Sequence, residues 1–364
     1  MLIPMLVAML SLDASGPIVF IGTYTNAKVP SEGIYAYRLD TKTGQMEPLG
    51  VAAKVGNPSF LAFHPSGKFL YAVSEDGVGT VTAFSINREK ARLTELNHVP
   101  SKGDGPCHLN VERNGKSLIV VNYGSGTTTR IPLGADGRLG AESVSVQHAK
   151  PTGVPGSDRK NQTAPHAHSV NYTPDGKFAL VADLGRDEVI SYKVDGPGLV
   201  AGPVTQIAGG SGPRHLAWLP SGKTAYVINE LRSTVAVLDY MGAGVLKERQ
   251  TISTLPTDFT GVSYTAEVQA HPSGKFLYGS NRGHNSISIF AIAADGKLTM
   301  VGTESTRGNW PRNFGIDPSG EWLIVANQNS NTMAVFRIDQ KTGKLTAVGE
   351  TIALGAPVCV KFLQ

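Results

Sequence analysis

Histidine, glutamate and arginine residues recur just before or just after short apolar segments of this sequence. The clearest examples stand in four motifs: His166 and His168 in "APHAHSV", Arg214 in "GPRHLAW", Glu230 in "VINEL" and Arg282 in "SNRG". Histidine and glutamate are the usual proton-transfer groups near neutral pH. Arginine binds carboxylate or phosphate through paired hydrogen bonds. The combination indicates acid/base chemistry on a small anionic substrate.

A metal centre is not expected among these residues. Zinc sites use three or four His, Cys or carboxylate ligands, and calcium sites cluster several carboxylates. The arginines here would instead repel a cation. We also expect His166 and His168 to point to opposite sides of one strand, which argues against joint ligation. No G-x-S-x-G nucleophile motif is present. We therefore predict no metal, no other cofactor and no covalent intermediate.

Internal repeats predict the elements that position these side chains. Every copy contains a short apolar strand, a P-S/D-G-K type turn, a second strand such as "FLYAV", a polar loop and an alternating third strand; the six copies begin at Asn57, Gly105, Ala164, Gly212, Tyr264 and Trp310. Segments such as "LTEL" and "LTMV" suggest a fourth strand. Four antiparallel strands repeated roughly every 45 to 60 residues are typical of a β-propeller blade.

The two ends of the chain complete each other. The N-terminal segments "IVFIGTYT", "GIYAYRLD" and "TGQMEPLG" resemble second, third and fourth strands, and the C-terminal "APVCVKFLQ" resembles a first strand. Joining them closes the ring and leaves no free sheet edge. We predict an all-β fold over residues 17–364, a single seven-bladed β-propeller with four antiparallel strands per blade. The alternative is an open β-sandwich with incidental repetition.

The blade pattern places the chemically active residues at one end of the ring. The start of a first strand and the end of a second strand lie at the same end, and the P-S-G-K turns lie at the other. His168, Glu230, Arg214 and Arg282 all fall on this rim. The predicted substrate-binding residues are His166, His215, Glu267, His284, Arg312, Gln328, Glu75, Arg159 and Gln162. Together they predict a pocket over the channel mouth.

The segment "QHAKPTGVPGSDRKNQTA" enters this rim immediately before His166. Arg159 and Gln162 are candidates for a lid or an extra anion contact. The alternative is a disordered loop, because proline, glycine and charge dominate the segment.

Composition bounds the partners and the compartment. The net charge of +4 arises from 33 basic and 29 acidic residues without a basic run, so neither nucleic acid nor a membrane is an expected partner. We expect a monomer or a weak homo-oligomer. Residues 1–16 are interpreted as a signal peptide or a disordered leader, which slightly favours a periplasmic or secreted location over a cytoplasmic one. Whether Cys107 and Cys359 pair stays open.

The motifs also carry a family resemblance. "GTYT", "NPSFLAFHPSGKFLYAVSE", "APHAHSV", "GPRHLAW", "VINEL", "SNRGHNSI" and "WPRNFGIDPSGEWLIVANQ" resemble the seven-bladed propeller lactonases of the bacterial 6-phosphogluconolactonase type, to which fungal carboxymuconate cyclases are related. The resemblance spans about residues 17 to 364. It implies metal-independent opening of a sugar δ-lactone to an aldonate, with His168, Arg214, Glu230 and Arg282 as the predicted catalytic residues.

Two other functions remain open at the level of sequence. The same acid/base groups could close a muconate-type acid to a lactone, as in the cyclase branch. Alternatively, the propeller could be a binding platform for an anionic ligand without chemistry. An aromatic content of only 7% argues against a platform, because platforms more commonly expose aromatic side chains.

Overall fold

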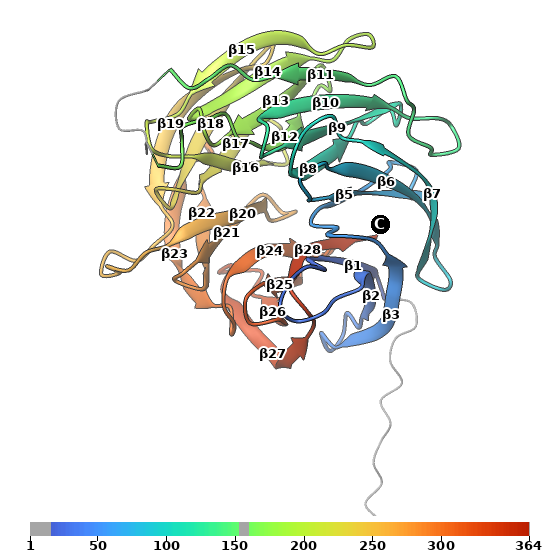
Figure 1. Cartoon of the computed structure of the whole chain (residues 1–364). Coiled ribbons are helices and arrows are strands. Elements are labelled where there is room, and N and C mark those ends of the chain that lie inside the picture. Colours follow the sequence, from blue (N-terminus) through green and yellow to red (C-terminus); the bar gives the residue numbers. More distant parts are fainter. Residues whose placement is uncertain (1–15, 153–159, 364) are drawn as a thin grey trace, which may run out of the picture.

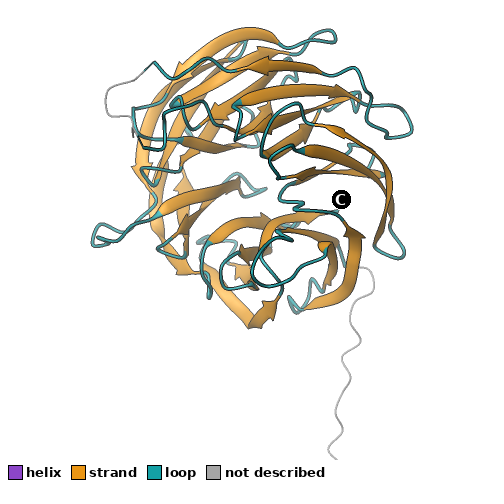
Figure 2. Cartoon of the chain, in the orientation of Figure 1, coloured by secondary structure: helices purple, strands orange, loops and turns teal. Residues whose placement is uncertain are grey.

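The fold is described from a computed structural model covering residues 16–152 and 160–363. Within these residues the elements are strands joined by loops, with no helix (Figure 2). Residues 1–15 of the predicted leader and Arg159 lie outside the described residues. No described helix is long and apolar enough to cross a membrane.

Seven four-stranded antiparallel sheets surround a central channel (Figure 1). The first sheet holds β28 (Pro357–Phe362), β1 (Ile18–Thr23), β2 (Gly33–Leu39) and β3 (Met46–Lys54). The second holds β4 (Leu61–Phe63), β5 (Phe69–Ser74), β6 (Thr80–Asn87) and β7 (Arg92–Pro100). The third holds β8 (Pro106–Val111), β9 (Ser117–Asn122), β10 (Thr127–Pro132) and β11 (Val144–Gln147).

The remaining four sheets follow the same order along the chain. The fourth holds β12 (Ala167–Tyr172), β13 (Phe178–Asp183), β14 (Glu188–Lys193) and β15 (Val200–Gln206). The fifth holds β16 (Pro213–Trp218), β17 (Thr224–Asn229), β18 (Thr234–Gly242) and β19 (Val245–Ser253). The sixth holds β20 (Tyr264–Ala270), β21 (Phe276–Arg282), β22 (Ser286–Ile292) and β23 (Leu298–Ser305). The seventh holds β24 (Pro311–Ile316), β25 (Trp322–Asn327), β26 (Thr332–Ile338) and β27 (Leu345–Ala353).

The first strand of each repeat lies innermost, and these strands contact one another around the whole ring. Contacts join β28 to β4, β4 to β8, β8 to β12, β12 to β16, β16 to β20, β20 to β24, and β24 back to β28. The ring closes through β1 and β28, which pair with Ile21 opposite Val360. The predicted seven-bladed propeller, with one blade shared by both ends of the chain, is confirmed.

The hydrophobic core lies between neighbouring blades. The second strands β9, β17 and β25 are buried along their whole length, because each sheet is covered by another sheet on both faces. The outermost strands, such as β19, are mostly exposed or half-buried. This gradient explains why second strands appear in the sequence as continuous apolar runs.

The P-S-G-K type turns connect first and second strands at the predicted end of the ring. In the turn after β4, the backbone N–H of Gly67 donates to the carbonyl of His64 at 2.8 Å, and Gly67 has φ of 64°. A positive φ of this kind favours glycine. His64 and His271 belong to these turns and hydrogen-bond to the carbonyls of Gly115 and Gly320 in the next blade.

The two cysteines lie on inner strands of different blades. Cys107 lies on β8 and Cys359 on β28, and both are free thiols buried in the core. The question of pairing left open by the sequence is therefore answered by their positions: no disulfide joins them.

Candidate active site

The inner strands carry a β-bulge near their first residues. Six of the seven shift register there against the second strand. In four of these strands the bulge inserts one extra residue, which is Cys107 in β8, His168 in β12, Arg214 in β16 and Arg312 in β24. A bulge bends the strand and re-aims the side chain of the extra residue. His168, Arg214 and Arg312 therefore occupy equivalent positions around the channel, at the predicted end.

Glu230 is the centre of the charged cluster. It follows β17, and its Oε2 accepts hydrogen bonds from Arg214 Nε at 3.0 Å and from Arg282 Nη2 at 2.8 Å. Burial would raise the pKa of the Glu230 carboxyl, but the charges of Arg282, Arg214 and Arg312 hold that pKa below its ordinary value. Glu230 is therefore a carboxylate at neutral pH, fixed by two guanidinium groups.

Both arginines are buried, and the Arg282 side chain is 6% exposed. The Arg214 side chain is only 2% exposed and also donates to the carbonyl of Ala266 at 2.7 Å. Burial and the neighbouring arginines lower the pKa of Arg214 to about 10. Arg282 also donates to the Thr265 carbonyl and lies 5.4 Å from the Trp310 ring centroid. Arg214 thus lies beneath Glu230, where it fixes the carboxylate.

Arg312 is the more accessible guanidinium of the site. Its side chain is 17% exposed, and Nη2 lies 3.6 Å from Glu75 Oε1. The guanidinium carbon is 5.4 Å from the ring centroid of Tyr24, whose hydroxyl donates to Glu75 Oε2 at 2.8 Å. Burial raises the pKa of Tyr24, so its hydroxyl stays protonated. Tyr24 was missed by the sequence analysis, although it follows a second strand, β1, as Glu230 follows β17.

His166 and His168 both contact Tyr123. The His166 ring stacks on Tyr123 at a centroid distance of 4.4 Å, and the His168 ring meets the same tyrosine edge-on at 5.4 Å. The prediction that the two histidines point to opposite sides was wrong. Residues two apart share one face of a regular strand, and here His166 precedes β12 while His168 is its bulged residue. Tyr123 was also missed, and it too follows a second strand, β9.

His168 is a neutral imidazole. Burial, reinforced by the positive charge of Arg214, holds its pKa well below the ordinary value. Its Nδ1 lies 3.8 Å from the sulfur of Cys107, whose pKa is raised by burial. Both groups are therefore uncharged at neutral pH.

Other predicted rim residues follow the ends of second strands. His284 follows β21, with Nδ1 2.6 Å from the hydroxyl of Ser286, and Gln328 follows β25. The buried Oε1 of Gln328 has no hydrogen-bond partner in the described residues. Gln162 is buried, and its amide donates to the carbonyl of Leu184 at 2.7 Å. This bond ties Gln162 to the loop after β13, at the same end of the ring as Glu230, and its role as an anion contact stays a prediction.

His215 and Glu267 lie at a different level of the channel from the one predicted. Both line a cavity that also includes His64, Pro65 and Ser66 of a first-to-second-strand turn, so it opens at the opposite end. His215 follows the bulged Arg214, and the backbone displacement at the bulge carries the next channel-facing side chain deeper. Their predicted place in the rim pocket was wrong.

The described residues contain no group of three or more histidine, cysteine or carboxylate side chains arranged to hold a metal ion. The rings of His168 and His108 each meet His215 edge-on, at centroid distances of 5.4 and 5.2 Å. The arrangement around Glu230 is instead that of a carboxylate between cations, beside a neutral imidazole. Such a set can bind an anion, polarise a carbonyl and accept a proton.

Comparison with known families agrees with this chemistry. Residues 18–362 match the family described as "Lactonase, 7-bladed beta-propeller". The chain belongs to this lactonase family. The prediction of an enzyme of the lactonase class is confirmed by this membership. A curated relative from Bacillus subtilis, named 6-phosphogluconolactonase, is 38% identical over 350 residues, 95% of this chain and 98% of its own.

Solved structures of the lactonase family superpose closely on this chain. The periplasmic gluconolactonase PpgL of Pseudomonas aeruginosa has a TM-score of 0.88 at 32% identity, covering 96% of this chain and 99% of its own. A putative 6-phosphogluconolactonase of Bacteroides fragilis also has a TM-score of 0.88, at 37% identity, covering 96% of this chain and 98% of its own. The predicted family resemblance is confirmed.

Proposed function

We propose that this lactonase-family protein hydrolyses a sugar δ-lactone to the aldonate, by metal-independent acid/base catalysis at the rim that carries Glu230. The observation that carries the proposal is the ion-pair cluster in which Arg214 and Arg282 share one oxygen of Glu230. The names of the relatives, 6-phosphogluconolactonase and gluconolactonase, support a lactone of this class.

Glu230 is the proposed general base. Both arginines bind its Oε2, and no hydrogen bond recorded for the described residues engages Oε1. The side chain is 17% exposed, whereas His168 is buried. Oε1 therefore takes a proton from water as the water oxygen adds to the lactone carbonyl carbon. The proton then passes to the ring oxygen as the ring C–O bond breaks, which leaves a hydroxyl group and a carboxylic acid that ionises.

Arg282 and Arg312 are the proposed substrate contacts. Oxyanion stabilisation by one positioned donor contributes about 10² to 10³-fold to kcat. Arg282 lies directly beside the proposed base, and Arg312 is the more exposed and the more loosely paired cation. Arg214 is a positioning residue, because it is buried beneath Glu230. His168 donates or accepts a hydrogen bond as a neutral group at the edge of the site.

The test measures hydrolysis of glucono-δ-lactone and of its 6-phosphate, using proton release above the spontaneous rate as the readout. Loss of a general base typically costs about 10² to 10⁴-fold, so Glu230→Gln should lower kcat by that factor. Glu89→Gln, an exposed turn residue, is the matched control and should leave kcat unchanged. Wild-type kcat in Glu230→Gln would contradict the assignment of the base. Turnover of a muconate, with neither lactone hydrolysed, would contradict the proposed direction of reaction.

A further inference from the structure

A cavity of about 890 Å³ occupies the end of the channel opposite the proposed active site. Its mouth is formed by first-to-second-strand turns, including His64 to Gly67 and Pro272, and its walls by the inner strands. Ligand pockets in proteins span about 300–1,000 Å³. None of the four predicted catalytic residues lines it, so the proposed reaction does not account for it.

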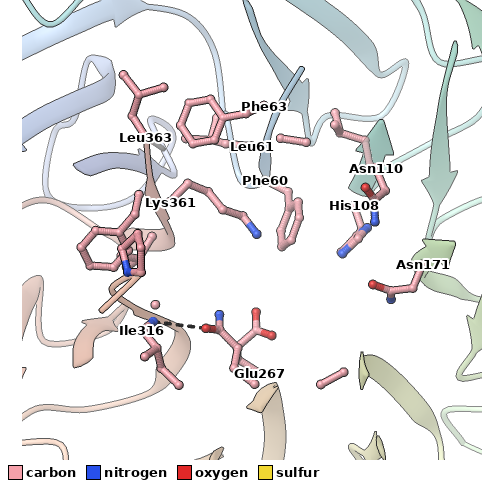
Figure 3. Close-up of a pocket in the computed structure, with 18 of the residues that line it drawn as sticks. Phe60, Leu61, Phe63, His108, Asn110, Asn171, Glu267, Ile316, Lys361 and Leu363 are labelled. Carbon is pink, nitrogen blue, oxygen red and sulfur yellow. Dashed lines mark hydrogen bonds between the residues drawn. The ribbon is translucent and has the colours of Figure 1, made fainter. Parts of the chain in front are cut away.

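The walls of the cavity are built from equivalent positions of different blades. The cavity is lined by Phe60, His108, His215 and Glu267 near the starts of the inner strands, and by Asn110, Asn171, Gln269 and Lys361 further along these strands. Figure 3 shows His108, Glu267 and Lys361 among them. Apolar side chains, among them Phe63 and Leu363, surround these polar groups. The cavity therefore combines a polar interior with an apolar wall.

Some polar groups of the cavity are already satisfied by the protein. Glu267 accepts hydrogen bonds from His215 Nδ1 at 3.2 Å, from Val268 N at 3.0 Å and from the Asn313 amide. Gln269 bonds through both its amide nitrogen and its oxygen to the backbone of β24. These groups have little capacity left for a ligand.

Three other polar groups are open, and they are mainly donors. The Lys361 ammonium lies 4.4 Å from the Phe60 ring centroid and forms no ion pair with any described carboxylate. The Asn171 side chain makes no hydrogen bond recorded among the described residues. His108 Nδ1 accepts from the backbone N–H of Val170 at 3.4 Å. The neutral ring then carries its proton on Nε2 as a donor.

Lys361, Asn171 and His108 come from three strands, β28, β12 and β8, and line one cavity, with the Lys361 ammonium on one side of the Phe60 ring and His108 stacked on the other (Figure 3). An ammonium that no described carboxylate contacts directly is complementary to a carboxylate, and the two donors beyond the Phe60 ring are complementary to further acceptor oxygens of the same ligand. Burial raises the pKa of Glu267 to about 7, with Lys361 and Arg214 opposing the rise. Part of the Glu267 population is therefore neutral near pH 7, which reduces repulsion of a bound anion.

We propose that this cavity binds a small organic carboxylate, whose carboxyl group contacts Lys361, whose further oxygens contact His108 and Asn171, and whose carbon body lies along the edge of Phe60 and against Phe63. The site is independent of the rim and of the reaction proposed there. Aromatic and aliphatic walls favour a ligand with a carbon body over inorganic phosphate.

The test uses isothermal titration calorimetry on the full chain, with sodium benzoate, sodium gluconate and inorganic phosphate as three separate probes. We expect at least one carboxylate to bind. Lys361→Met should raise the Kd of that carboxylate by about tenfold or more, because a hydrogen bond to a charged group is lost. Lys177→Met removes an exposed lysine at the same end of the ring and should leave Kd unchanged. Arg282→Met, at the other end, should also leave it unchanged.

Asn171→Leu is the second variant, so that a folding defect in Lys361→Met does not decide the result. It should weaken carboxylate binding while circular dichroism stays that of the wild type. Equal Kd values in the wild type and both cavity variants would overturn the proposal, as would binding of phosphate alone or of no probe. Loss of binding in Arg282→Met but not in Lys361→Met would place the anion at the rim and overturn it as well.

Discussion

Glu230 illustrates how single residues set the chemistry of the rim. Its carboxylate lies between Arg214 and Arg282, and their charges outweigh the burial that would otherwise favour the protonated acid. Burial and the charge of Arg214 lower the pKa of the nearby His168, so its imidazole is neutral. The proposed base is therefore ready to accept a proton throughout the neutral and mildly acidic range.

The first prediction, at this scale, concerns pH. Because the pKa of Glu230 is lowered, the acid limb of the kcat/KM profile should lie below pH 4.5, the ordinary value. Arg282 contributes the largest of the charge effects that lower it. Arg282→Met should therefore move the acid limb to higher pH, in addition to lowering kcat.

The measurement is a pH profile of kcat/KM on one lactone for the wild type, Arg282→Met and Arg307→Met. Arg307 is an exposed arginine paired with Glu350, and its replacement should leave the limb in place. An acid limb that stays fixed in Arg282→Met would show that another group titrates, even if kcat falls.

At the scale of elements, the blades are joined by hydrogen bonds from aromatic residues of second strands to the following blade. The hydroxyl groups of Tyr71, Tyr226 and Tyr278 donate to the carbonyls of Gly137, Gly296 and Gly343, and Trp322 Nε1 donates to that of Thr41. Each bond links a buried strand to the third-to-fourth-strand turn of the neighbouring blade. These contacts fix the angle between sheets, and with it the distances across the channel.

We predict that Tyr278→Phe lowers the free energy of unfolding by about 1 kcal/mol, because the Gly343 carbonyl loses its buried donor. Denaturant titration followed by circular dichroism measures this change. Tyr35→Phe removes a hydroxyl that makes an exposed hydrogen bond with the backbone of Glu32 and is the control. Equal denaturant midpoints for Tyr278→Phe and the wild type would contradict the stabilising role.

At the scale of the whole molecule, the ring depends on the pairing of β28 with β1. This pair joins the two ends of the described chain, and the Leu363 N–H adds a bond to the Ile18 carbonyl at 2.8 Å. Without β28, β1 would become an unpaired edge, and exposed edges promote aggregation. The closing blade therefore protects the ring and also carries Lys361 into the channel.

Deletion of residues 357–364 should convert the protein to aggregates, because it exposes the backbone of β1. Size-exclusion chromatography with light scattering measures the outcome. The control moves residues 357–363 through a short linker to the N-terminal side of Ile18, which restores the pairing within one continuous segment. We expect this rearranged chain to elute at the same size as the wild type. A compact soluble species from the deletion would contradict the closing role.

The sequence allowed many rim residues to be predicted. It did not allow us to predict how far along the channel each residue lies, or that tyrosines belong to the site. The rule that residues after second strands meet at one end correctly grouped Glu230, Arg282 and Glu75. The same rule applies to Tyr24 and Tyr123, which were passed over because only charged and imidazole side chains were considered. His215 and Glu267 were misplaced, because a bulge in an inner strand leaves no clear mark in the apolar pattern.

The repeat count, the order of strands in each blade and the joining of the chain ends follow from the sequence alone, because strand periodicity and turn residues are local properties. The tertiary structure decided that Arg214 and Arg282 are buried while Arg312 is more accessible, which oxygen of Glu230 is occupied and where each channel residue lies. Arg214, Glu230 and Arg282 come from two blades, and their contacts depend on bulges and on packing between sheets. These distances are set by segments far apart in the chain, and no local pattern encodes them.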